Sequence, residues 1–265
     1  FRQARGEKMS TDAYMKRVVH TCLKAGRLML AGGSEMYRVE DTMRRIAVNA
    51  GIKEVNVFAM PTGLFVSLDD GECSTVTELE TVKKRAINLE LVDQVNEFSR
   101  EFADKRIDLE ELEEKLREIE ENIPTFPLWL QVIGAGILSA TLMVLFLDVY
   151  DWIDFPVAGL VGASGYLMDS WLKGHTKIRF LAEMIAAMEM GLLTIIINGI
   201  FPACNVNNIL TGALMTLVPG LALTNALRDL FMGDWVSGIV RMCEAAMTAI
   251  ALGGGVGIVI RFLGA

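Results

Sequence analysis

Hydrophobic and polar positions follow different patterns in the two halves of the chain. Up to Pro127, apolar residues recur at the spacings of helices and strands with one buried face, and charged residues stand between them. After Pro127, apolar residues form long runs with few charges, and the first run, residues 128–147, has 20 residues and no charge. About 20 such residues cross ~30 Å of hydrocarbon. The pattern predicts a water-facing first half and a lipid-facing second half.

The lipid-facing half contains five apolar runs, which predict five transmembrane helices. The fourth run is interrupted by Pro219-Gly220, and the alternative for it is a re-entrant segment that does not cross the membrane. Small residues in the second and fifth runs, among them Gly159, Gly253 and Gly257, predict close contacts between helices. The expected helices cover residues 128–147, 155–172, 180–200, 208–223 and 235–262.

The water-facing half has the pattern of an α+β domain. Gly32-Gly33 ends the first amphipathic helix, Ser34 is placed to cap the second, and Asp108 is placed to cap the last. Between them the period changes to that of strands, with a turn at residues 69–71. The expected helices cover 12–31, 35–49, 86–104 and 108–121, and the expected strands 55–59, 64–68 and 73–79.

These patterns define the expected fold class and its two domains. The chain is predicted to be an α-helical polytopic membrane protein with an N-terminal cytoplasmic α+β domain. The cytoplasmic domain covers residues 1–126 and includes charged helices before the membrane, and the membrane domain covers residues 127–265. The first 126 residues are too polar for a signal peptide; Met9 is a candidate start, which leaves open whether residues 1–8 are native.

The charge distribution agrees with this division and excludes several classes of protein. Residues 1–127 contain 19 Lys/Arg and 24 Asp/Glu, whereas residues 128–265 contain 6 and 9. Both halves are therefore acidic, which argues against a nucleic-acid partner. The 4 Cys are far apart and the chain has 2 His, so no disulfide framework, zinc site or other metal site is expected, and no cofactor.

The charges of the loops predict the orientation in the membrane. The first loop, 148–154, contains three Asp and no Lys or Arg, whereas the second, 173–179, contains three basic residues, and the fourth contains Arg228. Because basic loops stay on the cytoplasmic side, the N-terminal domain is expected in the cytoplasm and the C-terminus outside. Only Arg261, near the outer end, argues weakly against this.

Three acidic residues lie inside the second and third predicted membrane helices, where a charge costs about 2.5–3.5 kcal/mol at a helix centre. Asp169 is four residues before Lys173, so a local ion pair is the alternative to a functional role. Glu183 is close to the inner surface, and Glu189 is deeper and is the preferred candidate for proton coupling. The alternative for Glu189 is a buried acid that is hydrogen-bonded to a neighbouring helix.

The fifth predicted helix has a polar face formed by Ser237, Arg241, Glu244 and Thr248. The last three follow Ser237 by 4, 7 and 11 residues, which places all four on one side of a helix. The planar fork of Arg241 suits a substrate carboxylate, while Glu244 is a candidate for proton coupling or gating. Mutual neutralisation of these two charges is the alternative.

The break in the fourth run is a second candidate for a solute path. Pro219 and Gly220 interrupt the helix, and Asn225, Arg228 and Asp229 follow. Interrupted helices expose backbone groups where transporters bind solutes and ions. A plain proline kink is the alternative.

The residues of this region and of the first half resemble a known family. The run from Pro219-Gly220 through Asn225, Asp229 and Gly233 to Arg241 and Glu244 is similar to the signature of the threonine/serine exporter (ThrE) family, with its YjjP-like members. The stretch from Gly33 to Met43 and Met60-Pro61-Thr62-Gly63 are similar to the N-terminal part of that family.

The resemblance implies a multi-pass inner-membrane exporter of threonine and serine, or of succinate and related dicarboxylates for YjjP-like members. Full-length members have about twice as many helices, so a second, YjjB-like membrane subunit and a hetero-oligomer are implied.

The roles of single residues are inferred from their chemistry and position. The expected substrate-binding residues are Asn225, Arg241, Pro219, Gly220 and Ser237. The expected proton-coupling or gating residues are Glu189, Glu244, Asp229, Asp169 and Glu183.

The leading hypothesis is therefore a secondary transporter that is coupled to protons and lies in the lipid bilayer. The alternative is a membrane-anchored regulatory or scaffold subunit, whose cytoplasmic domain binds a protein. An enzyme is not expected, since no catalytic residues, nucleophile–base pair or two-aspartate motif is found.

Overall fold

The structure of the chain, a computed structural model, describes residues 2–69, 71, 75–82, 86–147, 152–176 and 178–263. The central residue of the predicted 69–71 turn, the start of the predicted strand at 73–74, most of the aspartate-rich loop 148–154, Lys177 and the C-terminal Ala265 lie outside these ranges.

The chain forms two compact units. The first consists of Phe1–Thr125 and Thr224–Met242, and the second of Phe126–Leu223 and Cys243–Ala265. Helices α9 (Gly220–Met232) and α10 (Trp235–Leu263) each contribute residues to both units.

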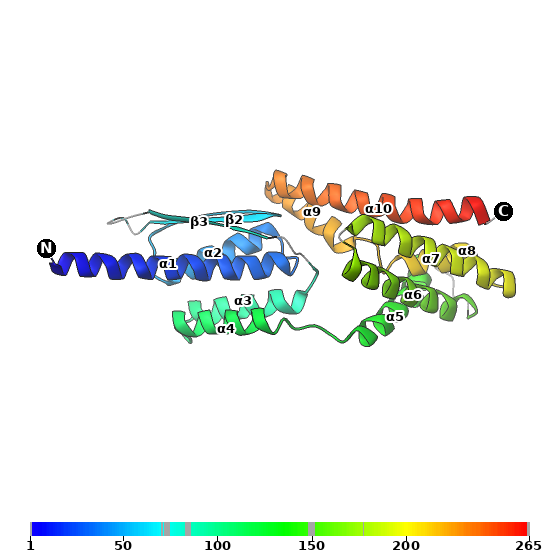
Figure 1. The fold of residues 1–265 in the computed structure, drawn as a ribbon, viewed down its shortest axis with the longest axis horizontal. Helices are drawn as coiled ribbons and strands as arrows, with labels where there is room; N and C mark the ends of the chain where they lie inside the picture. The colour runs from blue at the N-terminus through cyan, green and yellow to red at the C-terminus, as the bar shows by residue number, and fades with distance from the viewer. Residues whose placement is uncertain are drawn as a thin grey trace. The chain divides into compact units, whose positions relative to one another are not determined.

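The N-terminal part of the first unit is built in three layers. A sheet of β1 (Glu54–Met60), β2 (Gly63–Asp69) and β3 (Thr75–Thr81) covers one side of α1 (Arg2–Ala31) and α2 (Met36–Asn49). Helices α3 (Leu89–Ala103) and α4 (Leu109–Glu121) lie on the other side (Figure 1). The strands are antiparallel in the order β1-β2-β3, with Phe58 opposite Phe65 and Phe65 opposite Leu79.

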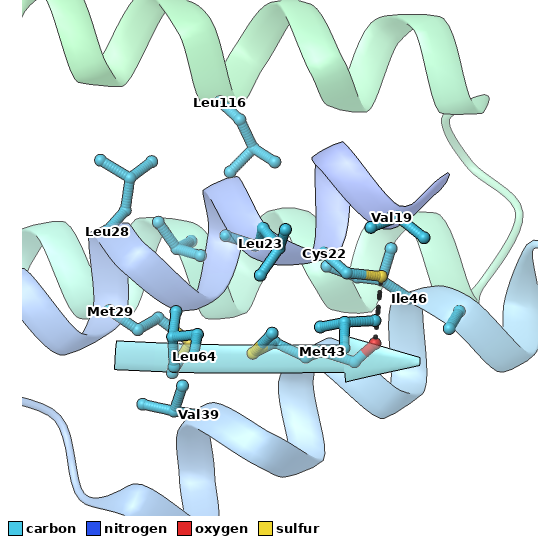
Figure 2. Close-up of a cluster of buried hydrophobic side chains, with 14 of the residues drawn as sticks. Val19, Cys22, Leu23, Leu28, Met29, Val39, Met43, Ile46, Leu64 and Leu116 are labelled. Carbon is cyan, nitrogen blue, oxygen red and sulfur yellow. Dashed lines mark hydrogen bonds between the residues drawn. The ribbon is translucent and has the colours of Figure 1, made fainter. Parts of the chain in front are cut away.

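Large aliphatic side chains fill the space between these layers. Leu23 and Met29 of α1, Met43 and Ile46 of α2 and Leu64 of β2 point toward one another (Figure 2) and are at most 2% exposed. The Cys22 thiol donates a hydrogen bond to the Met43 carbonyl oxygen at 3.4 Å, and burial raises the pKa of this thiol to about 12. The thiol is therefore held in its protonated form, which is the unreactive one.

The second unit is built of helices, which approach one another through small residues. It contains α5 (Leu128–Leu147), α6 (Asp154–His175), α7 (Arg179–Ile200), α8 (Val206–Leu214) and the later part of α10. Helices α5 and α6 meet at Gly136 and Gly159, where a Cβ atom on either glycine would lie 3.0 or 3.1 Å from the other's carbonyl oxygen. Such close backbone contact is how helices pack in lipid.

Within the described ranges, three helices are long and apolar enough to cross a membrane: Leu128–Leu147, Phe180–Ile200 and Trp235–Leu263. The first of these has the predicted bounds. The fourth run, over 208–223, forms two helices on either side of the predicted break, because α8 ends at Leu214 and α9 begins at Gly220. Pro219 has no N–H to continue a helix, and its carbonyl oxygen accepts the Leu223 N–H at 3.0 Å.

Candidate functional site

The first element of the site is the corner between α1 and α2, residues 33–36, called the α1–α2 corner below. Gly33 has a φ of +88°, which glycine adopts without strain. The Gly33 N–H donates to Leu30 O at 3.2 Å and the Ser34 N–H to Met29 O at 3.0 Å, which is a Schellman motif. This arrangement turns the chain sharply and leaves the carbonyl oxygens of Gly33 and Ser34 available to other parts of the molecule.

Two side chains from the C-terminal segment of the first unit donate to these carbonyl oxygens. Asn225 Nδ2 lies 3.0 Å from Gly33 O, and Arg241 Nη2 lies 2.7 Å from Ser34 O. Arg241 is only 7% exposed. Two of the predicted substrate-binding residues, on α9 and α10, therefore converge on one corner of the chain.

The turn between α9 and α10 explains how these side chains come together. Gly233, with φ +94°, ends α9 in the same motif, because its N–H donates to Leu230 O and the Asp234 N–H to Asp229 O. Gly238 then lets α10 pack closely on α9, since a Cβ there would lie 2.5 Å from Leu230 Cγ. The resulting hairpin places Asp229 beside Arg241.

Asp229 provides the acceptor of the site. Its Oδ1 accepts the Met36 N–H at 3.3 Å, and its Oδ2 lies 3.4 Å from Arg241 Nε. Met36 is the first residue of α2, and the N-cap residue Glu35 makes no side-chain cap, so the carboxylate of Asp229 supplies the missing acceptor at this helix terminus. Burial raises the pKa of Asp229, although Arg241 and the Met36 N–H act in the opposite direction.

An ion pair lies at the rim of this cluster, and two polar groups lie inside it. Arg228 Nη1 is 2.6 Å from Glu35 Oε1. Ser34 and Ser237 are buried. In the part of the chain that the structure describes, Ser34 Oγ and Asp229 Oδ2 have no hydrogen-bond partner. The prediction that Ser34 caps α2 is therefore wrong: it is the third residue after α1, where it belongs to the Schellman motif, and Glu35 occupies the N-cap position.

A second charged cluster lies within the second unit. Lys173 Nζ is 2.8 Å from Asp169 Oδ2 and 3.3 Å from Glu183 Oε1, and the two acids are 5% and 2% exposed. Lys173 therefore bridges two buried carboxylates from two helices. Asp169 and Lys173 do form the local pair, and Glu183 of α7 joins it.

The other predicted proton-coupling acids lie apart from this cluster. Glu189 is half-buried on α7, it faces Ser164 of α6, and its buried Oε2 has no hydrogen-bond partner among the described residues. Glu244 is half-buried on the part of α10 that belongs to the second unit, whereas Ser237 and Arg241 belong to the first. Pro219 lies between α8 and α9, and Gly220 is the first residue of α9.

Three sets of buried polar contacts were not predicted from the sequence, two in these clusters and one outside them. The corner carbonyl oxygens and the Met36 N–H are backbone groups, which no residue type signals. Lys173 was expected in a basic loop or in a pair with Asp169, and its contact with Glu183 was not predicted. Asp154 was counted only as a loop charge, but it is fully buried and accepts the Asn205 N–H at 2.9 Å and Asn208 Nδ2 at 3.0 Å, which ties α6 to α8.

Metal chemistry finds no support in the described residues, which contain no group of three or more His, Cys, Asp or Glu side chains that could hold a metal ion. A surface groove of about 530 Å³ between α1 and α4 is lined by charged residues of both signs. These include the ion pairs Arg17–Glu113 at 2.8 Å and Arg117–Glu114 at 3.1 Å, so the groove has little surplus charge to attract an ion.

Comparison with known proteins adds a family to this geometry. The profile of the ThrE family, described as "Putative threonine/serine exporter", matches residues 20–263. The chain is 23% identical over 248 residues to the "Probable succinate transporter subunit YjjP" of Klebsiella aerogenes, with 92% of this chain and 93% of that protein covered. It is 21% identical to the protein of the same description in Escherichia coli K12, with 89% and 91% covered.

A third relative is longer. The "Uncharacterized protein C7D4.12c" of Schizosaccharomyces pombe is 25% identical over 243 residues, which are 89% of this chain but 32% of that protein. No solved structure matches the chain.

Proposed function

Because the chain belongs to the ThrE family of threonine/serine exporters, we propose that it is a proton-coupled secondary transporter, which exports small polar carboxylates with the help of a second membrane subunit. Transport and a membrane location follow from the family and the apolar helices. The observation that supports the proposed solute site is the convergence of the half-buried Asn225 with the buried Asp229 and Arg241.

The chemistry of this set suits a carboxylate. Asn225 and Arg241 present N–H donors, and Arg241 can hold a carboxylate with two parallel hydrogen bonds. Asp229 can accept from an ammonium group, which threonine and serine have and succinate lacks. Ser237 is buried one turn before Arg241 on α10, so we include it in the site, whereas Pro219 and Gly220 stay candidates from the family motif.

The acids of the second unit are the proposed proton carriers. Asp169 and Glu183 are buried and share Lys173, so protonation of either acid changes the charge of this cluster. Glu189 and Glu244, half-buried on α7 and α10, are further candidates for coupling or gating. A charge in this environment is costly enough that acids are retained there for a function.

The proposed topology has residues 1–126 in the cytoplasm of the cell, the helices in the inner membrane and the C-terminus outside. Helix α8 has 9 residues and spans about 14 Å, so it crosses only together with the segment that follows it. The partner is a second small multi-pass subunit, in line with the word "subunit" in the descriptions of the two bacterial relatives.

The test is transport by the chain and its partner subunit in liposomes under a proton gradient. Serine, threonine and succinate are assayed in parallel, with Arg241→Gln as the site variant and Arg261→Gln, an exposed position on the same helix, as the matched control. We expect export to fall at least about tenfold with the first variant and to be unchanged with the second. The absence of transport of all three solutes by the parent protein would refute the proposal.

The alternative function, a regulatory or scaffold subunit, is favoured by one feature of the first unit. Phe58, Phe65 and Leu79 form a row across the outer face of the sheet and are 52%, 36% and 53% exposed. An exposed apolar row on an otherwise polar face suits a protein partner. If Phe58→Ser abolishes binding of a protein while transport continues, the two functions coexist; if the parent transports nothing but retains that binding, the scaffold function replaces the exporter.

A further inference from the structure

We propose that the α1–α2 corner is a built-in plug of the solute site, which must withdraw before a solute can bind. The corner occupies, with its own backbone, the polar groups of Asn225, Asp229 and Arg241. This inference rests on the proposed function, because the same three side chains are the proposed solute ligands.

The backbone of the corner resembles an amino acid in its hydrogen-bonding groups. The carbonyl oxygens of Gly33 and Ser34 accept from Asn225 and Arg241, as the two oxygens of a carboxylate would. The Met36 N–H donates to Asp229 Oδ1, as an ammonium group would. A dicarboxylate offers acceptors only, and it would replace the corner fully only if Asp229 were protonated.

The hydrogen bonds of the α1–α2 corner are of a kind that can break and form again. Helix α2 obtains no side-chain cap from its own N-cap residue Glu35, so the contact of its first N–H with Asp229 can be exchanged for water without breaking a local motif. Ser34 is 5% exposed, and its Oγ has no hydrogen-bond partner in the described ranges, so the closed state leaves a polar group unsatisfied. By contrast, the carbonyl oxygens of Ala31 and Gly32 are held by the N–H groups of Ala86 and Asn88.

The ion pair of Glu35 with Arg228 offers a way to displace the corner without touching the proposed ligands. The two side chains are 2.6 Å apart and are 15% and 50% exposed. Reversing one charge replaces attraction by repulsion beside the corner, and exchanging both charges restores the attraction between positions 35 and 228. Glu35 Oε2 also lies 3.5 Å from Arg38 Nε, so Arg38→Gln is introduced into every protein of the comparison. Asp41, which pairs with Arg45 at 2.7 Å within α2, provides a matched charge reversal away from the corner.

The test measures maleimide labelling of Ser34→Cys in the full chain, in nanodiscs and with Cys73 and Cys243 replaced by Ser. The buried Cys22 and Cys204 remain. We expect Glu35→Arg and Arg228→Glu each to raise the labelling rate about three- to tenfold, as expected for disruption of a partly exposed pair. The double exchange should restore the original rate, and Asp41→Arg should leave it unchanged. Val48→Cys, at an exposed position of α2, should be labelled equally fast in all variants.

A solute is then added to the parent Ser34→Cys protein. L-serine or succinate should raise the labelling rate, and the one that does so identifies the solute class. A rate that responds neither to the charge reversals nor to either solute overturns the plug, as does an equal rise with Asp41→Arg. If liposomes show no transport while the exchange of charges still controls labelling, the proposed function fails and withdrawal of the corner stands.

Discussion

The interior of each unit is packed with residues of a different size, although both units bury apolar surface. The core of the first unit is filled by large side chains such as Leu23, Met29 and Leu112, whose removal from water stabilises the fold. In the second unit, glycines such as Gly136, Gly159 and Gly255 let helix backbones approach. Lipid is as apolar as leucine, so contact there is stabilised by close packing and not by escape from water. Large-to-small substitutions should therefore harm the first unit, and small-to-large substitutions the second.

The largest effect is expected from a cavity in the first unit. Leu23→Ala removes a side chain that is 2% exposed, and we expect the free energy of unfolding of this unit to fall by about 2–5 kcal/mol. Hydrogen exchange of the β2 and α2 amides in the full chain measures this. The control Leu79→Ala, at a position that is 53% exposed, should change exchange little. Equal effects of the two variants would contradict the assignment of the core.

The converse substitution should break the second unit. A Cβ at Gly255 would lie 2.5 Å from the Met184 carbonyl oxygen of α7, whereas a Cβ at Gly253 meets nothing within 4 Å in the described chain. We expect Gly255→Val to destabilise the second unit by about 1–3 kcal/mol, and Gly253→Val to have little effect. The midpoint of thermal unfolding in nanodiscs distinguishes them. If both variants are equally stable, α10 does not pack on α7 through Gly255.

Removing the partner of buried acids in the second unit should lower the free energy of unfolding more than breaking an exposed ion pair in the first. Lys173→Met leaves the buried Asp169 and Glu183 without their shared ammonium, and we expect a loss of about 1–2 kcal/mol. Arg117→Met in the first unit breaks a pair whose side chains are 62% and 69% exposed, and we expect at most about 0.5 kcal/mol. Lys173→Arg, which keeps the charge, should recover part of the loss in thermal unfolding. A larger loss with Arg117→Met would reverse this part of the comparison.

Local rules predicted the elements whose causes are local. The bounds of α5 follow from an uncharged run of membrane length, and Asp108 caps α4 as predicted, because its Oδ1 accepts the Glu111 N–H at 2.8 Å. Among the described residues, Gly253 and Gly257 do not make the predicted close contacts, and the packed glycine of that run is Gly255. The spacing of small residues predicts that a helix has a smooth face, but not which face meets a neighbour.

The candidate site depended on contacts that sequence spacing cannot predict. Arg228 was counted as the charge of a loop, yet Arg228 and Asp229 both belong to α9. Their charges are stabilised by Glu35 and Met36, which are 193 positions away in each case. The residue types of Asn225, Asp229 and Arg241 indicated a polar site. The groups that they bind are backbone atoms, and only the fold brings them together.

The smallest expected effect is a pH dependence of the first unit alone. Burial raises the pKa of Glu40 above its ordinary value of 4.5, although the hydrogen bond that it accepts from the Ala59 N–H acts in the opposite direction. The folded state therefore holds this proton more tightly than the unfolded state, and the stability from this group is full below pH 4.5 and is lost as the pH rises through the raised pKa. Glu40→Gln keeps an acceptor for Ala59 and removes the charge. We expect it to stabilise the unit by about 0.5 kcal/mol at pH 7 and to have no effect at about pH 4.

Glu120 provides the opposite sign as a control. Burial alone would raise its pKa, but hydrogen bonds and ion pairs with Arg27 and Lys24 outweigh burial and lower it. The stability from Glu120 is thus present above its ordinary value of 4.5 and is lost as the pH falls through the lowered pKa. Glu120→Gln should destabilise the first unit at pH 7, and less so as the pH falls. The measurement is hydrogen exchange of the β1 and α4 amides between about pH 4 and pH 7. The effects of the two variants should differ in sign, because burial governs the titration of Glu40 and ion pairing governs that of Glu120. Parallel pH profiles would show that one cause acts on both.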